Sequence, residues 1–276
     1  IICSALVLFM TPGLAFFYGG LVRASSVVSM MMMSFGSVAM IGVMWVVFGY
    51  AMAFASPSSS GFIGIDSVIG IDLNKLFLND VLDQAKGGDG FGLAFAGFQG
   101  TFAIITVALI SGAIADRAKF GAWMLFGAIW AVVIYFPVAS WIFNFQVTDG
   151  KITSGGWLVH EIGVLDFAGG TVVEIASGAS ALALALVVGK RFGFTKGMHA
   201  PHNVPLTLIG AAILWFGWFG FNAGSELAAD GIASLAFINT MAAPAAAMLG
   251  WILIEKLKHG KATSIGAASG AVAGLV

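Results

Sequence analysis

The run FGLAFAGFQGTFAIITVALISGAIA, residues 91–115, sets the fold class because it contains no charged residue. A helix needs roughly 20 mostly apolar residues to cross a bilayer, and this run is long enough. Backbone that contacts lipid has to satisfy its own hydrogen bonds, which favours helices over open strands. Further apolar segments lie at residues 1–22, 27–54, 121–145, 167–188, 204–221, 232–254 and 263 onward. The sequence therefore predicts an all-α polytopic membrane protein.

The composition supports the same class. The 276 residues are 59% hydrophobic and 9% charged, with a mean hydropathy of +1.00, whereas soluble domains carry about 25% charged residues. The net charge of −1 gives no reason to expect nucleic-acid binding. Cys3 is the single cysteine, so a disulfide framework and a cysteine metal cluster are excluded. The histidines show no metal-ligand spacing, so we expect no metal and no cofactor.

Both ends of the chain lie inside apolar runs. We interpret residues 1–276 as a single transmembrane domain that is a fragment with both termini cut. The longest connector, residues 55–90, holds Ser, Gly and acidic residues and is expected to be an extracytoplasmic loop.

The basic residues predict the orientation, because cytoplasmic loops are enriched in Lys and Arg. If the first end is outside and the sides alternate, the inner loops hold most of them: Arg23, Arg117, Lys119, Lys190, Arg191, Lys196, Lys256, Lys258 and Lys261. The outer loops hold only Lys75, Lys86 and Lys151. We therefore expect a protein of the cytoplasmic (plasma) membrane with its N-terminus outside.

A weak internal repeat links two spans. The motif GLAFFYGG at residues 13–20 is similar to GWFGFNAG at residues 217–224, and the two spans are expected to run in opposite directions. Inverted repeats are common in transporters, where the site lies between the repeats. A chance match between two segments rich in Gly and Phe explains the similarity equally well.

Two acidic residues mark the fifth predicted span, Asp166 at its start and Glu174 inside it. A charged side chain at the bilayer centre costs about 2.5–3.5 kcal/mol on insertion scales. Asp166 fits a helix N-cap, and also a carboxylate that orders carbonyls facing a cation. On an α-helix Glu174 would lie roughly 80° around and about 12 Å along from Asp166, so both would line one path. Burial disfavours the charged form. We therefore favour Glu174 as a hydrogen-bond donor or proton relay over a neutral Glu bonded to a neighbouring helix.

Aromatic residues form a third group of candidates. Phe98 and Phe102 lie one turn apart, and Phe221 precedes Asn222 and Ser225 in the sixth span. Aromatic faces attract cations, and a neighbouring hydroxyl accepts a hydrogen bond from an ammonium-type ion. With 24 Phe in the chain, packing is the competing interpretation for any single ring.

Several ordered motifs resemble those of the ammonium transporter (Amt/Mep/Rh) family, and its bacterial Amt branch in particular. They are DFAGGTVVEIASG (166–178) continuing to GKR (189–191), YGGLVR (18–23), AGFQGTF (96–102), GWFGFNAGS (217–225) and PHN (201–203). The resemblance implies a bundle of eleven helices in two inverted halves, assembled as a homotrimer, of which about eight helices are present here.

The resemblance also assigns roles to particular residues. It makes Phe102 and Phe221 the two stacked gate rings, places Phe102 and Ser225 at the outer substrate-recruitment site, and makes Asp166 the buried aspartate of the fifth helix. For the aromatic residue of the outer vestibule it leaves Phe143, Trp141 and Trp157 open.

The same resemblance places Glu174 where the family usually has the first of two pore histidines, and acids are known at this position. It implies a protein surrounded by membrane lipid that transports ammonium across the cytoplasmic membrane. Ammonium would be captured and deprotonated, and ammonia would pass through an apolar pore while the proton is transferred with it. A PII-type regulator would act through a C-terminal tail beyond residue 276.

Alternatives are an ammonium sensor on the same fold and a passive ammonia gas channel. An integral-membrane enzyme is disfavoured, because the sequence offers no nucleophile–base pair.

Overall fold

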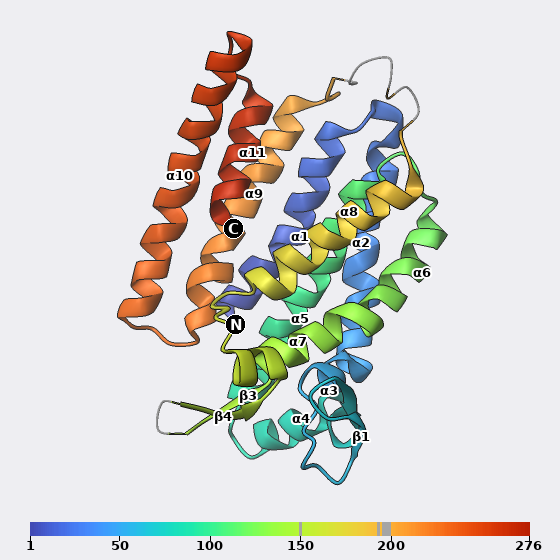
Figure 1. Ribbon diagram of the computed structural model, residues 1–276, viewed down its shortest axis with the longest axis vertical. Helices are drawn as coiled ribbons and strands as arrows, with labels where there is room; N and C mark the ends of the chain where they lie inside the picture. The colour runs from blue at the N-terminus through green and yellow to red at the C-terminus, as the bar shows by residue number, and fades with distance from the viewer. Residues whose placement is uncertain (149–150, 192–193, 195–199) are drawn as a thin grey trace.

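The computed structural model describes residues 1–148, 151–191, 194 and 200–276, and these form a bundle of long helices (Figure 1). Within the described part, seven helical segments are long and apolar enough to cross a membrane. They are Ile2–Leu21, Ala24–Ala53, Phe91–Ile114, Phe120–Phe143, Gly170–Val188, Val204–Glu226 and Gly231–His259, and the shorter Ser264–Leu275 follows. Each predicted span overlaps one of these segments, so the predicted fold class is confirmed.

Each of the seven candidate spans contains at least one α-helix. The helices that matter for the site are α1 (Ile2–Leu21), α2 (Val27–Met44), α5 (Phe91–Ile110), α8 (Ala176–Val188), α9 (Val204–Asn222), α10 (Gly231–His259) and α11 (Ser264–Leu275). Shorter α-helices are α3 (Tyr50–Ala53), α4 (Asn79–Lys86), α6 (Phe120–Trp130) and α7 (Phe136–Phe143). The 3₁₀ segments Ala24–Ser26, Leu73–Leu78, Ser111–Ile114 and Ala223–Glu226 connect or extend them.

The π-helical segments in the described part of the chain were not anticipated from the sequence. They are η2 (Trp45–Gly49), η5 (Ala131–Tyr135), η6 (Leu158–Ile162) and η7 (Gly170–Ile175). The first two lie inside the second and fourth spans, and η7 opens the fifth. A π segment widens the helix locally and is frequent at functional sites. Apolar periodicity does not distinguish it from an α-helix.

The α-helical spacing assumed between Asp166 and Glu174 is wrong. The backbone of Gly169 is left-handed, with φ +112°, and residues 170–175 are π-helical. The carboxylate of Asp166 accepts hydrogen bonds from the amides of Gly169 and Thr171, which holds this irregular turn. The angle and rise of a regular helix therefore do not apply to this stretch.

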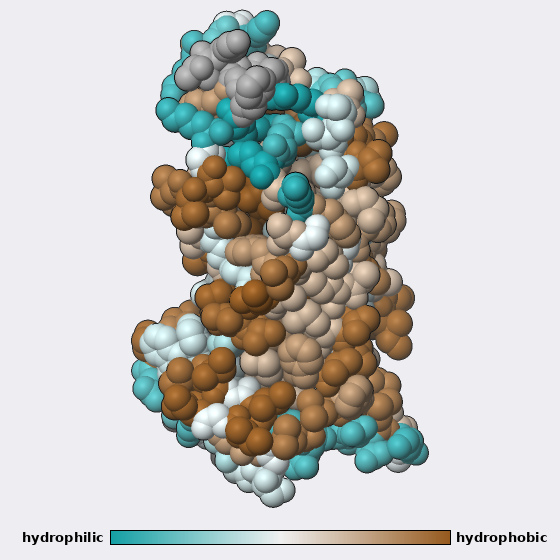
Figure 2. Space-filling view, turned by 90° about the vertical axis from the view of Figure 1, so that its right-hand side faces the viewer, coloured by the Kyte–Doolittle hydropathy of each residue, from teal (hydrophilic) through white to brown (hydrophobic). Residues whose placement is uncertain are grey.

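The surface has the distribution of polarity that a bilayer requires. Figure 2 shows an apolar zone between two polar ends of the bundle. Exposed Leu, Ile, Val and Phe side chains occur on most of the long helices. Such a surface is suited to contact with lipid, because soluble monomers rarely expose contiguous apolar patches of this extent.

Helices α1 and α9 pack closely through glycines, and their contacts repeat. A Cβ on Gly13 would lie 2.7 Å from Ile213 Cγ2, whereas one on Gly217 would meet Met10. Gly20 and Gly224, the second pair of equivalent glycines, face Thr207 and Cys3 in the same way. As the residue number rises on α1, its partner's number falls on α9, so the helices are antiparallel. The contacts confirm the opposite directions expected for the two spans, and the inverted repeat stays a prediction.

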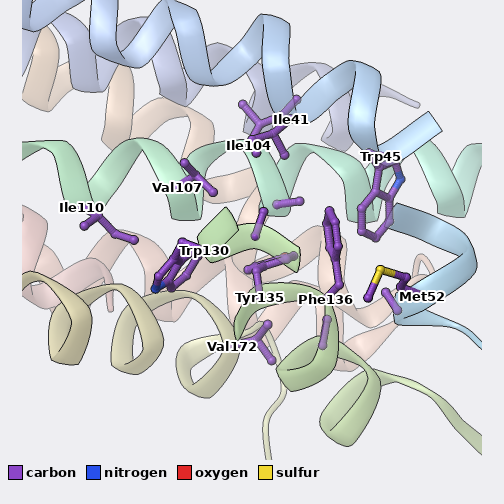
Figure 3. Close-up of a cluster of buried hydrophobic side chains, with 14 of the residues drawn as sticks. Ile41, Trp45, Met52, Ile104, Val107, Ile110, Trp130, Tyr135, Phe136 and Val172 are labelled. Atoms are coloured by element: carbon purple, nitrogen blue, oxygen red, sulfur yellow. The ribbon is translucent and has the colours of Figure 1, made fainter. Parts of the chain in front are cut away.

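Helix α5 lies between two buried clusters. One of its faces contributes Ile104, Val107 and Ile110 to a cluster that contains Trp45 and Phe136, which Figure 3 shows. The indole N–H of Trp45 donates to the carbonyl of Ala96, 2.8 Å away, and fixes α5 against the second span. The opposite face of α5 carries Phe98 and Phe102 in the second cluster. This packing turns both rings towards α9.

The connector at residues 55–90 has structure of its own. It contains the antiparallel hairpin β1 (Phe62–Ile65) and β2 (Ile69–Asp72), followed by α4. A second hairpin, β3 (Phe145–Thr148) and β4 (Lys151–Gly155), lies at the same end of the bundle (Figure 1).

Lys196, one of the basic residues that predict the membrane orientation, lies outside the described residues. The N-outside orientation stays a prediction.

Candidate functional site

Two phenylalanines from different helices form the centre of the candidate site. The ring centroids of Phe102 on α5 and Phe221 on α9 are 4.5 Å apart at an interplanar angle of 43°. Each side chain is 2% exposed. Phe98 lies edge-on to Phe102 at 4.7 Å, and Trp218 lies 5.2 Å from Phe221. The structure thus brings together the two rings that the sequence singled out.

Glu174 lines an apolar cavity beside these rings. The cavity has a volume of about 60 Å³ and is lined by α1, α5, α9, α11 and the fifth span, with Phe221 in its wall. Apart from Glu174, the lining residues with polar side-chain atoms are Tyr18 and Trp218. Glu174 Oε1 is buried and has no hydrogen-bond partner among the described residues. A carboxyl group buried in this way is costly unless a partner satisfies it, so it marks a functional position.

Asp166 acts on the backbone of the turn before the fifth span. Its carboxylate oxygens lie 2.6 Å from the Gly169 amide and 2.9 Å from the Thr171 amide. A Cβ built on Gly169 would lie 3.6 Å from atoms of both Phe102 and Phe143. Asp166 therefore holds a turn that lies against the aromatic site. The N-cap residue of η7 is Gly169 and not Asp166, so the expected position was wrong, but the Asp166 carboxylate still performs the capping role of accepting hydrogen bonds from amides at the start of the span.

We expect Asp166→Ala to lower the free energy of unfolding by about 2–4 kcal/mol, because two backbone amides lose a charged acceptor. Thermal unfolding of the purified protein in detergent measures the change. Asp83→Ala is the control, since Asp83 is exposed and pairs only with Lys86. An unchanged melting temperature for Asp166→Ala would contradict the capping role.

The outer aromatic candidates differ in what they contact. Phe143 is half-buried and its ring edge approaches the turn at Gly169. Trp141 instead donates its indole N–H to the carbonyl of Val68 at 2.6 Å, and its ring lies 5.6 Å from that of Trp157. Trp141 is therefore engaged with the 55–90 connector and with Trp157. Phe143 and Phe102 both lie against the turn at Gly169.

Ser225 lies one helical turn beyond Phe221. Its hydroxyl donates to the carbonyl of Phe221 at 2.7 Å. Its oxygen lone pairs remain available to accept a hydrogen bond from a ligand with N–H groups. Asn222 is committed elsewhere, because its amide donates to Thr240 Oγ1 and the Leu275 carbonyl.

Sequence reasoning missed Tyr18 and Trp218 as cavity residues. Tyr18 donates its hydroxyl to the carbonyl of Leu109 at 2.9 Å and lines the cavity from α1. Trp218 is 4% exposed, and its indole Nε1 has no partner among the described residues. Both belong to the two halves of the repeat motif. The inverted repeat was therefore the signal in the sequence that pointed to them.

A polar network joins the loops at the opposite end of the bundle from the hairpins. Asp116 forms an ion pair with Arg191, and the Arg117 guanidinium donates to the carbonyls of Gly189 and Ala113. Burial alone would raise the pKa of Asp116. Hydrogen bonds from Ser26 and Arg191, together with nearby positive charge, outweigh this and lower the pKa below 3.8.

This lowered pKa predicts the sign of a pH effect on stability. The ion pair stabilises the fold above the unfolded-state pKa, and the stabilisation is lost as the pH falls through the folded-state pKa. In Asp116→Asn we expect a loss of about 1 kcal/mol at neutral pH and a shallower decline on acidification. Asparagine suits the test because Asp116 has φ +62°, a left-handed conformation that Asn tolerates. Unfolding curves from neutral pH down to about pH 3 measure the effect, and parallel curves for both proteins would refute it.

Comparisons with known proteins agree with this geometry. The family model described as Ammonium Transporter Family matches residues 1–276. The whole chain is 49% identical to an ammonium transporter of Mycobacterium bovis and covers 59% of that relative. An ammonium transporter of Bacillus subtilis is 46% identical over 99% of this chain and is covered to 63%.

Solved structures agree on the fold. The crystal structure of Saccharomyces cerevisiae Mep2 has a TM-score of 0.83 at 33% identity, with 99% of this chain and 60% of that chain covered. A structure named Sensor Amt Protein has a TM-score of 0.83 at 26% identity, with 99% and 70% covered.

The apolar helices and these relatives define a multi-pass membrane protein of the transporter class. The chain spans about three fifths of the length of these two curated relatives. It belongs to the Ammonium Transporter Family.

Proposed function

We propose that this protein transports ammonium across the cytoplasmic membrane, with its N-terminus outside. The observation that carries the proposal is the buried Phe102–Phe221 pair beside a cavity lined by Glu174, one of whose carboxyl oxygens is buried without a partner among the described residues. The relatives bear the name ammonium transporter, which supports the substrate. We propose no enzymatic step, and we expect a homotrimer with a PII-type regulator at its cytoplasmic side.

Capture takes place on the outer side of the ring pair. Ser225 accepts a hydrogen bond from the ammonium ion, and the faces of Phe102 and Phe143 attract its charge. As the ion loses water it passes between Phe102 and Phe221. Cation–π attraction is strongest for a desolvated ion, so buried rings suit this step.

The inner step is a proton transfer. Beyond the rings the walls are apolar, and a cation there is far less stable than neutral ammonia. Ammonium gives up its proton, ammonia crosses the cavity, and Glu174 relays the proton. Potassium has no proton to lose and donates no hydrogen bonds, which gives a physical basis for its exclusion.

The test is current in proteoliposomes that contain the full-length protein. Addition of ammonium is expected to evoke an inward current, and potassium at equal concentration is expected to evoke none. Ammonia flux without current would indicate a passive gas channel instead. Absence of any flux would contradict transport altogether.

A sensor is the second candidate function, because a structure of closely similar fold is named Sensor Amt Protein. A sensor binds ammonium through the same outer site and conducts little or none. Saturable ammonium binding in the absence of flux would favour this alternative over transport.

A further inference from the structure

All three arginines of the chain lie in three short loops at the end of the bundle opposite the hairpins (Figure 1). Each loop adjoins the end of a helix in a span, and the loops comprise residues 22–26, 115–119 and 189–191. They contain five basic residues and one acidic residue, which are Arg23, Arg117, Lys119, Lys190, Arg191 and Asp116. The loops therefore carry a large excess of positive charge.

Contacts between described residues join the three loops into one surface. Arg191 forms an ion pair with Asp116, which links the third loop to the second. Ser26 donates a hydrogen bond to the same carboxylate and adds the first loop. The guanidinium of Arg117 also reaches the third loop, where it donates to the carbonyl of Gly189. The basic side chains are therefore held near one another by the fold.

The carboxylate of Asp116 does not balance the charge around it. Arg117 donates to two backbone carbonyls, which carry no net charge. Lys119 and Lys190 are exposed, and the side chain of Arg191 is 37% exposed. A guanidinium has five N–H donors, so the contact of Arg191 with Asp116 leaves donors for a second anion. The surface is thus suited to bind a further oxyanion.

The position of the surface favours a phosphate group that belongs to a lipid. The apolar span Gly170–Val188 ends directly before the third loop. In the last turn of α8, Leu186 and Val187 are 75% and 84% exposed, so acyl chains have apolar side chains to contact beside Lys190 and Arg191. Basic clusters between transmembrane helices at a membrane surface suit the headgroups of anionic lipids. A free phosphate ion has no use for the apolar neighbours.

We propose that the surface formed by the three loops binds the phosphate group of an anionic phospholipid. Arg191 and Lys190 contact the phosphate oxygens, Lys119 contacts the headgroup from the second loop, and an acyl chain lies along α8. Arginine can pair with phosphate through two parallel N–H···O bonds, which fixes the headgroup more closely than charge alone. The site is separate from the cavity beside Glu174 and requires no transported substrate.

A distance measurement between lipid phosphorus and arginine nitrogen tests the site in the full-length protein. Protein with ¹⁵N-labelled arginine is placed in bilayers of phosphatidylcholine with or without phosphatidylglycerol, and the dephasing of guanidinium signals by ³¹P is recorded. The signal of Arg191 is assigned as the one missing from Arg191→Lys. We expect strong dephasing of this signal with phosphatidylglycerol and weak dephasing with phosphatidylcholine alone.

Two pairs of lysines separate a built site from diffuse attraction. The variant Lys119→Gln/Lys190→Gln removes two positive charges from the surface. The control Lys256→Gln/Lys258→Gln removes two from the exposed last turn of α10, at the same end of the bundle. The fraction of phosphatidylglycerol that gives half-maximal dephasing of Arg191 should rise roughly tenfold in the first variant and stay within about a factor of two in the control.

Several results would overturn the proposal. An equal change in both variants, or no change in Lys119→Gln/Lys190→Gln, would mean that the lipid is attracted diffusely and not by this surface. Absence of dephasing in the wild type would mean that no lipid phosphate lies at Arg191. Inorganic phosphate added to phosphatidylcholine bilayers is the last arm. If it dephases Arg191 as strongly as phosphatidylglycerol does, the ligand is a free phosphate and the lipid assignment is wrong.

Discussion

Replacing Glu174 by leucine is expected to reduce ammonium-evoked current by roughly a hundredfold, because the positioned group that relays the proton is gone. Leucine fills similar space in the apolar cavity. Removal of a carboxyl group whose buried Oε1 has no partner in the described part of the chain is not expected to reduce the free energy of unfolding. Current in proteoliposomes and thermal unfolding together separate the functional effect from a folding defect.

Glu161→Leu is the matched control for that experiment. Glu161 is exposed, lies before the fifth span and does not line the cavity. Its replacement should leave the current within a factor of about two. Wild-type current in Glu174→Leu would remove the proton role of this residue.

The second large effect is expected at the ring pair. Phe221→Leu keeps an apolar side chain but removes one π face from a site where desolvated cation–π attraction is worth about 2 kcal/mol. The half-saturating ammonium concentration should therefore rise roughly thirtyfold. Dose–response curves of the current measure the shift. Phe221→Ala is a less suitable variant, because truncation of a buried Phe costs about 3–5 kcal/mol of stability.

Phe219→Leu provides the comparison on the same helix. The ring of Phe219 packs against Phe237 at 4.5 Å, away from Phe102. Phe219→Leu removes a ring contact comparable to that of Phe221, but it leaves the Phe102–Phe221 pair intact. Equal half-saturation values for Phe221→Leu and the wild type would contradict the capture and passage of ammonium at the ring pair.

The parts of the fold that follow from hydrophobicity were predictable. The run at residues 91–115 has no charge, and the structure places a helix there from Phe91 to Ile114. The opposite directions of the first and sixth spans were also expected, and α1 and α9 pack antiparallel through glycines. Small residues allow close helix approach, and this physical requirement is visible in the sequence.

The local geometry of the fifth span was not predictable in the same way. The backbone of Gly169 has φ +112°, and a π-helical segment follows it. The left-handed turn and the π-helical segment are accompanied by hydrogen bonds from two backbone amides to Asp166. The periodicity of apolar residues does not predict these hydrogen bonds. The sequence located Asp166 and Glu174 correctly as unusual acids, but their relation in space came only from the structure.

The candidate site was predicted in part. Phe102 and Phe221 were singled out by motif, and the structure places their rings together. Trp218 was missed because a tryptophan in an apolar helix resembles any packing residue until its unpartnered N–H is seen. Trp141 was a candidate through the family resemblance, and the structure shows its indole N–H donating to the carbonyl of Val68 in the 55–90 connector.

Infrared difference spectroscopy tests the central claim, that Glu174 meets the substrate inside a water-poor cavity. The full-length protein in lipid is exchanged between potassium and ammonium, and the carboxyl C=O stretching region is compared with that of Glu174→Gln. We predict a difference band on addition of ammonium that is absent from Glu174→Gln. A protein that conducts ammonium but shows no such band, or the same band in both proteins, would contradict the account.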